Sequence, residues 1–167
     1  MKIIDNFLPD YQFKQVEKVL MSNQIPWYYG PSLESPLYKG KKARYQFTHV
    51  FFAQEHGGNK TYFFDVIEPC LVALRVSYLR KVKCNLNPRT LFHRWNDYHI
   101  DFKNLPVAKT AVYYINTNNG YTKFQKGGKV KSVANRMVIF DSDQYHRGVT
   151  CTDQDERVVV NFNYESN

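Results

Sequence analysis

Four side chains in the second half of the chain have types and an order suited to metal-dependent oxidation. His99 and Asp101 are two residues apart, so on a β-strand they would project from the same face. His146, from a distant strand, would complete two imidazole nitrogens and one carboxylate oxygen on one side of a metal ion. Such a set leaves the opposite coordination positions open, as non-haem Fe(II) requires to bind a cosubstrate and dioxygen. Arg157 offers a planar, permanently charged fork for a carboxylate of a dicarboxylic cosubstrate.

Each of these residues has an ordinary structural explanation when it is taken alone. A His-x-Asp sequence arises often by chance, and a histidine such as His146, just past the apolar strand that ends at Phe140, is usually a surface residue. Arg157 opens an apolar strand, where an arginine is usually an edge charge. The four residues occur in one order that suits a single site, and this order favours the functional interpretation.

The elements that must position these residues are predicted to be short β-strands. From Leu79 onward, β-rich runs follow one another and are separated by turn signals such as Asn118-Asn119-Gly120 and Gly127-Gly128. The predicted strands are 79–85, 90–95, 98–101, 110–116, 121–124, 129–133, 136–140, 148–150 and 158–164. The last strand is apolar at alternate positions and carries Arg157, Asn161 and Asn163 on the other parity, which indicates polar side chains that point into a barrel mouth.

The N-terminal half is predicted to support this β-region. Helical spacing of apolar residues predicts helices over 10–22, with Asp10 able to cap the start, and over 63–77, with Pro69 starting or kinking the second one. Strands are expected over 25–29 and 45–53. The Pro/Gly/Lys-rich stretch 32–44 reads as a loop, either a substrate lid near the mouth or an ordinary surface loop.

These patterns together predict one mainly β domain with flanking helices, built on a double-stranded β-helix (a jelly-roll, cupin-like core). A single oxygenase domain over 1–167 is expected, with a helical and strand support over about 1–78 and the β-helix core over about 79–164. The 167 residues suit one domain, and 43% hydrophobic and 16% aromatic residues are typical of a globular protein.

Composition also bears on compartment and partners. The cysteines Cys70, Cys84 and Cys151 are odd in number and widely spaced, which predicts reduced thiols in a cytoplasmic protein, and no membrane-spanning or signal segment is evident. The formal net charge of +8 leaves an acidic substrate, a nucleic acid or a ribonucleoprotein open as partner. The basic residues are scattered apart from one cluster over 39–44, so a solvated basic surface explains the charge equally well.

Residues 79–164 resemble the 2-oxoglutarate/Fe(II) oxygenases of the prolyl 4-hydroxylase-like branch, in particular its compact bacterial and phage-encoded members. The segments that carry the resemblance are Tyr98-His99-Ile100-Asp101, Ala111-Val112-Tyr113-Tyr114-Ile115-Asn116, Arg136-Met137-Val138-Ile139-Phe140, His146-Arg147-Gly148-Val149 and Arg157. The chain departs from the family where a Gly-Gly-acidic-Leu segment is usual, because it has Gly120-Tyr121-Thr122-Lys123-Phe124 there.

The resemblance implies a dioxygenase with Fe(II) held by His99, Asp101 and His146, and with 2-oxoglutarate and O2 as cosubstrates. Arg157 and Tyr114 would then bind the far carboxylate of 2-oxoglutarate, and Asn161 would line the pocket. It further implies hydroxylation of a prolyl residue in a protein or peptide, with release of succinate and CO2, in the cytoplasm (that of the host for a phage-encoded member).

Two other functions stay open at this point. A nucleic-acid-oxidising, dealkylating oxygenase would use the basic surface, although no aromatic base-flipping motif is identifiable. A non-catalytic cupin-type module would hold a metal or a small acid without turnover. Such a module has no need for a carboxylate-pairing arginine beyond the distal histidine, so Arg157 argues against it.

Overall fold

The computed structural model describes residues 1–31, 45–103 and 105–166. The stretch 32–44, predicted as a lid or surface loop and containing the whole local basic cluster, lies outside the described residues. Two antiparallel sheets make up the β-structure, as the jelly-roll prediction requires. The prediction of a mainly β fold with flanking helices is therefore confirmed.

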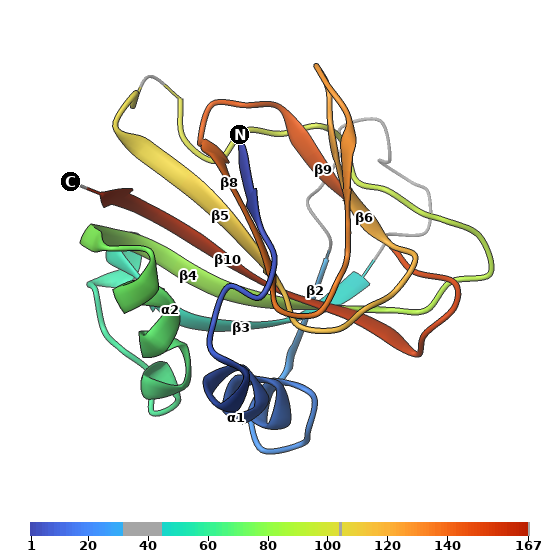
Figure 1. The fold of residues 1–167 in the computed structure, drawn as a ribbon, viewed down its shortest axis with the longest axis horizontal. Coiled ribbons are helices and arrows are strands. Elements are labelled where there is room, and N and C mark those ends of the chain that lie inside the picture. The colour runs from blue at the N-terminus through green and yellow to red at the C-terminus, as the bar shows by residue number, and fades with distance from the viewer. Residues whose placement is uncertain (32–44, 104, 167) are drawn as a thin grey trace.

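The larger sheet has seven strands in the order β1-β8-β5-β10-β4-β3-β2. Its strands, in chain order, are β1 (Lys2–Ile4), β2 (Tyr28–Pro31), β3 (Tyr45–Ala53), β4 (Val76–Pro88), β5 (Ala108–Tyr114), β8 (Arg136–Asp141) and β10 (Glu156–Ser166). The smaller sheet has the order β7-β6-β9 and consists of β6 (Tyr121–Phe124), β7 (Lys129–Lys131) and β9 (His146–Val149). Figure 1 shows β6 and β9 on one side of the larger sheet and the helices on the other.

The helical elements of the described residues all precede β4. They are α1 (Asp10–Leu20), the short 3-10 turns η2 (Gln54–His56) and η3 (Phe64–Ile67), and α2 (Glu68–Ala73). Helix α1 buries Phe13, Val16 and Leu20, which recur at helical spacing along one face. No helix within the described ranges is both long and apolar enough to cross a bilayer.

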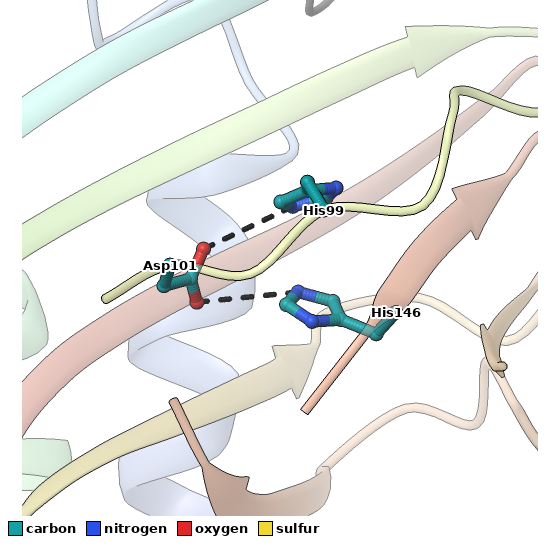
Figure 2. A group of neighbouring side chains, drawn as sticks. All are labelled: His99, Asp101 and His146. Carbon is teal, nitrogen blue, oxygen red and sulfur yellow. Dashed lines mark ion pairs between the residues drawn. The ribbon is translucent and has the colours of Figure 1, made fainter. Parts of the chain in front are cut away.

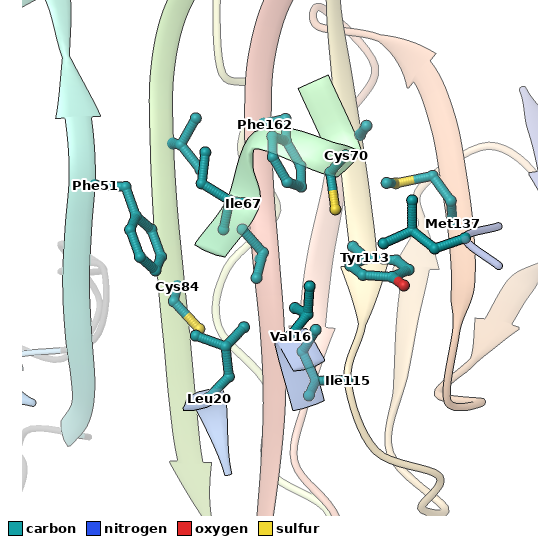
Figure 3. Close-up of a cluster of buried hydrophobic side chains, with 14 of the residues drawn as sticks. Val16, Leu20, Phe51, Ile67, Cys70, Cys84, Tyr113, Ile115, Met137 and Phe162 are labelled. Atoms are coloured by element: carbon teal, nitrogen blue, oxygen red, sulfur yellow. The ribbon is translucent and has the colours of Figure 1, made fainter. Parts of the chain in front are cut away.

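Two apolar clusters lie on opposite faces of the larger sheet. The first joins α1 and α2 to side chains from β3, β4, β10, β5 and β8, and Figure 3 shows ten of its members labelled. The second, between the two sheets, includes Val112, Tyr114 and Val159. Strand alternation explains this division, because Val158, Val160 and Phe162 of β10 join the first cluster while the intervening positions face the second sheet.

Three local predictions differ from the structure. Residues 90–95 and 98–101 are not strands: only Trp95 and His99 pair there, as isolated bridges to Val149 and His146. A run of β-favouring residues becomes a strand only beside a partner, and this segment has single bridges instead. Asp10 does not cap α1, because Pro9 is the cap residue and Asp10 lies in the first turn, where its charge favours the helix dipole. The predicted helix over 63–77 is divided into η3 and α2, and Pro69 lies at the start of α2.

Candidate functional site

His99, Asp101 and His146 come together where the segment 89–103 crosses the end of the smaller sheet. His99 and His146 exchange backbone hydrogen bonds of 3.0 Å in both directions, which form the isolated antiparallel bridge. The backbone N–H of Asp101 donates to the carbonyl of Ser142, at 2.9 Å. Backbone pairing therefore fixes all three Cα positions although His99 and Asp101 belong to no strand.

The potential metal-binding atoms of the three side chains face one another, as Figure 2 shows. All lie within 4.8 Å of one another. Nε2 of His99 is 3.8 Å from Oδ1 of Asp101, and Nε2 of His146 is 4.0 Å from Oδ2. The Nδ1 atom of His146 donates to the carbonyl of Gln144 at 2.9 Å, and that of His99 approaches the carbonyl of Asp97 at 3.4 Å. These contacts favour a proton on Nδ1 and leave a lone pair on each Nε2.

Asp101 is held by two polar side chains from the larger sheet. Thr110 of β5 and Asn163 of β10 both donate hydrogen bonds to Oδ2, and Asn163 also donates to the hydroxyl of Thr110 at 3.0 Å. Partners of this kind orient a carboxylate before any ligand arrives. Because both bonds go to Oδ2, Oδ1 keeps its lone pairs for a metal ion.

The donor set fits an iron(II) ion. Two imidazole nitrogens and one carboxylate, gathered on one side, are the ligands of non-haem Fe(II) oxygenases. Burial lowers the pKa of His99 first of all, and the neighbouring His146 lowers it further. A lower pKa keeps the imidazole neutral, which is the form that binds a metal ion.

Arg157 lies in the same cavity and is almost fully buried, with 3% of its surface exposed. Its Nε donates to Ser132 at 2.9 Å, and one Nη approaches Thr122 at 3.4 Å. Every ion pair among the described residues is formed by another cation, and no carboxylate of these residues lies within 4.0 Å of the Arg157 guanidinium. Burial lowers the pKa of Arg157, but a guanidinium keeps its proton in proteins. A buried cation with free donors and no protein anion is a site for an anionic ligand.

Gly120 and Thr122, in the segment that departs from the family pattern, shape the arginine side of the cavity. A Cβ atom on Gly120 would lie 2.7 Å from Cδ of Arg157 and 2.9 Å from the carbonyl oxygen of Val149. The arginine stem can therefore pass only over a glycine. Thr122 links the guanidinium to Tyr114, whose hydroxyl donates to the threonine Oγ1 at 2.8 Å.

One cavity of about 470 Å³ joins these groups and has room for a small dicarboxylic acid together with part of a substrate. Its lining includes His99, Asp101, His146, Thr122, Arg157 and Asn161. Tyr114 is fully buried and is not among the lining residues, because its hydroxyl lies behind Thr122. Its ring centre is 5.6 Å from the Arg157 guanidinium carbon. The structure thus brings together five of the six predicted site residues and puts Tyr114 one layer further out.

Sequence reasoning did not assign roles to the residues that hold this site. Thr110 and Ser132 are ordinary polar residues in or near strands, and nothing in their spacing marks them. The sequence does mark Asn163, because it lies an even number of residues from Arg157 along the last strand and so projects from the same face. That parity aims it into the cavity, where it contacts Asp101.

No protein-family model and no curated protein sequence matches the chain. Solved structures do match over nearly the whole length. An oxidoreductase of the 2OG-Fe(II) oxygenase family from Burkholderia pseudomallei superposes with a TM-score of 0.70 at 9% identity, over 98% of this chain and 84% of that one. A prolyl hydroxylase from Trichoplax adhaerens, in complex with a hypoxia inducible factor peptide fragment, gives 0.57 at 16% identity, over 98% and 83%.

A third similar structure is the non-haem alpha-ketoglutarate-dependent epimerase SnoN from nogalamycin biosynthesis. It gives a TM-score of 0.62 at 12% identity, over 98% of this chain and 76% of that one. The chain therefore has the fold of the 2-oxoglutarate/Fe(II) oxygenases. At such low identities the likeness is one of fold, and proteins of this fold catalyse more than one reaction.

Proposed function

We propose that this protein is an Fe(II)- and 2-oxoglutarate-dependent dioxygenase. The observation that carries the proposal is a single cavity with a His-Asp-His cluster and with Arg157, a buried cation that has no carboxylate partner among the described residues. A dicarboxylic keto acid suits both features, since one end can chelate a metal ion while the far carboxylate pairs with the guanidinium. The fold is the one in which this chemistry is known to occur.

When bound, Fe(II) and 2-oxoglutarate would supply the oxidising chemistry, in which dioxygen and the keto acid yield succinate, CO2 and a hydroxylated substrate. His99, Asp101 and His146 would hold the metal ion through Nε2, Oδ1 and Nε2. Thr110 and Asn163 would keep Asp101 in the orientation already present. Arg157 would bind the far carboxylate, with Ser132 and Thr122 fixing the plane of its guanidinium.

Tyr114 and Asn161 take subsidiary roles in this proposal. Asn161 would contact the cosubstrate from the cavity wall. Tyr114 would act through Thr122, because its hydroxyl bonds that threonine and its ring lies beside Arg157. Val112 and Val159 also line the cavity, and their apolar side chains would exclude water from the cosubstrate.

We further propose that the substrate is a prolyl residue of a protein or peptide. The motifs around His99, Tyr114 and His146 resemble prolyl hydroxylases, and one structural neighbour is a prolyl hydroxylase with a bound peptide. One structural neighbour is an epimerase, so the prolyl substrate does not follow from the fold alone. The three cysteines are free and buried, which suits work in a reducing compartment such as the cytoplasm.

Anaerobic titration of the purified protein with Fe(II) and 2-oxoglutarate tests the class without a known substrate. We expect a visible charge-transfer band from the chelated complex. We expect Asp101→Ala to abolish the band and, once oxygen is admitted, to abolish succinate formation as well. A folded, metal-loaded protein without the band would contradict the proposal and favour a metal- or small-acid-binding module. Mass spectrometry of proline-containing peptides after turnover, searching for one added oxygen, then tests the prolyl substrate.

A further inference from the structure

The wall of the cavity formed by β4 is polar. Lys81, Lys83, Asn85 and Asn87 line the cavity, while Val82, Cys84 and Leu86 between them pack into the apolar cluster below the sheet. This alternation follows from the strand itself. Neither metal binding nor 2-oxoglutarate binding, as described above, uses these side chains.

Lys83 is the cation of this wall that has no acidic partner in the described part of the chain. The neighbouring cations on the strand are paired, Arg80 with Glu165 and Lys81 with Glu55 at 2.5 Å. No ion pair within 4.0 Å is recorded for Lys83. Burial lowers its pKa first of all, and the Lys81 charge lowers it further, whereas Asp101 raises it. Lys83 is thus partly desolvated, and it is close enough to the His-Asp-His cluster to interact electrostatically with Asp101.

With metal and cosubstrate bound, Lys83 would be an uncompensated charge. The two positive charges of Fe(II) and the one of Arg157 balance the single charge of Asp101 and the two of 2-oxoglutarate. Asp101 would then be neutralised by the metal ion and could no longer offset Lys83. An unpaired ammonium group in a partly closed cavity favours an incoming anion.

Asn85 adds a hydrogen-bond acceptor beside this cation. It is buried, with 6% of its surface exposed, and its Oδ1 atom has no hydrogen-bond partner among the residues that the structure describes. Across the sheet, Val159 pairs with Asn85 and Asn161 pairs with Lys83, so these cavity-lining side chains form one continuous patch. A ligand that satisfies the patch needs an anionic group for Lys83 and an N–H donor for Asn85.

We propose that Lys83 and Asn85 form a substrate subsite that selects peptides with an acidic residue next to the oxidised position. The side-chain carboxylate would bind Lys83, and a backbone N–H of the peptide would donate to Asn85 Oδ1. This inference rests on the proposed function. A peptide is favoured over a nucleic acid because, among the described residues, β4 presents one unpaired cation to the cavity, whereas a phosphate backbone requires several.

Binding to protein loaded with Mn(II) and 2-oxoglutarate without oxygen tests the subsite without turnover. The probes are two pools of short, blocked, fluorescent peptides with a central proline, one flanked by Asp and Glu and the other by Asn and Gln. We expect the acidic pool to bind about tenfold more tightly, as one charge-assisted hydrogen bond predicts. Lys83→Met should reduce the ratio of the two affinities to near unity, and Lys83→Gln should do the same. Asn85→Ala should weaken both pools alike and keep the ratio.

Lys18→Met is the matched control, because it removes the same charge from the exposed face of α1. It should keep the full preference for the acidic pool. Equal binding of both pools by the unaltered protein, or an unchanged ratio in Lys83→Met, would overturn the inference. So would tighter binding of a single-stranded oligonucleotide that depends on Lys83, which would reassign the subsite to a phosphate. The Fe(II)/2-oxoglutarate band separates the two failures: its presence without a pool preference refutes the subsite alone, and its absence refutes the proposed function.

Discussion

In the proposed site, Asp101 and Arg157 are the two side chains whose polar contacts orient them before any ligand binds. Asp101 accepts hydrogen bonds from Thr110 and Asn163 at Oδ2, and its Oδ1 is left for a ligand in the cavity. Arg157 donates from Nε to Ser132, and its remaining N–H donors are left for a ligand. A residue held in this way loses little freedom when its ligand binds, so preorganisation supports affinity. The consequences of removing either set of contacts can be separated experimentally.

Replacement of Arg157 should affect the cosubstrate and spare the metal ion. Arg157→Ala removes the charged partner of the far carboxylate and should weaken 2-oxoglutarate binding by about 100-fold, in the range for one partner of a buried charge pair. Arg157→Lys should recover only part of the loss, since an ammonium lacks the planar fork. Titration of the charge-transfer band gives the 2-oxoglutarate affinity, and calorimetry with Mn(II) gives the metal affinity. Unchanged keto-acid affinity in Arg157→Ala would remove this residue from its proposed role.

Replacement of Asn163, unlike that of Arg157, should weaken binding of the metal ion. Asn163→Ala deletes a hydrogen bond to the Asp101 carboxylate and another to Thr110. Loss of such a supporting contact typically weakens metal binding about 10–100-fold. Mn(II) calorimetry should detect this change, and Thr110→Val should produce a similar one. Because both residues belong to one network, the effects should not add in the double variant. Additive effects would show that the two residues support Asp101 separately.

At the scale of elements, the small sheet positions the arginine through its backbone. Gly120 precedes β6, and its missing side chain leaves the space through which the Arg157 stem passes. Gly120→Ala should therefore displace Arg157 and weaken 2-oxoglutarate binding while metal binding persists. Gly128→Ala, between β6 and β7, is the matched control, since no atom lies within 4 Å of its added Cβ. Equal band titrations for the two variants would mean that the arginine can move without loss of the carboxylate.

The elements also explain how far the sequence could predict the site. The spacing of His99 and Asp101 predicts that both side chains lie on one side, and in the structure both face His146 although neither lies in a strand. The backbone bridge between His99 and His146 and the hydrogen bond from the N–H of Asp101 to Ser142 hold the two residues in the absence of a strand. Ser132 and Thr110 were beyond prediction because their roles depend on which strands become neighbours. The division of the predicted helix over 63–77 depends likewise on how the chain turns back to start β4.

At the scale of the whole molecule, one sheet separates two environments. The helix-covered face is apolar and closed, with Leu20, Phe51 and Cys84 fully or almost fully buried. The opposite face holds the cavity and the polar inner side chains of β4 and β10. The larger of the two apolar clusters thus lies on the face away from the cavity, and the proposed binding groups lie on the other face.

This separation predicts that stability and ligand binding respond to different substitutions. Leu20→Ala, at the end of α1 under the sheet, should lower the free energy of unfolding by about 2–5 kcal/mol, as expected for a cavity in a packed core. Urea unfolding measures the loss. At urea concentrations below the unfolding transition, the 2-oxoglutarate affinity from the charge-transfer band should match that of the unaltered protein. Leu20 packs against the helix-covered face of the sheet and not against the cavity. A weakened band titration in folded Leu20→Ala would mean that helix packing reaches through the sheet and sets the geometry of the cavity.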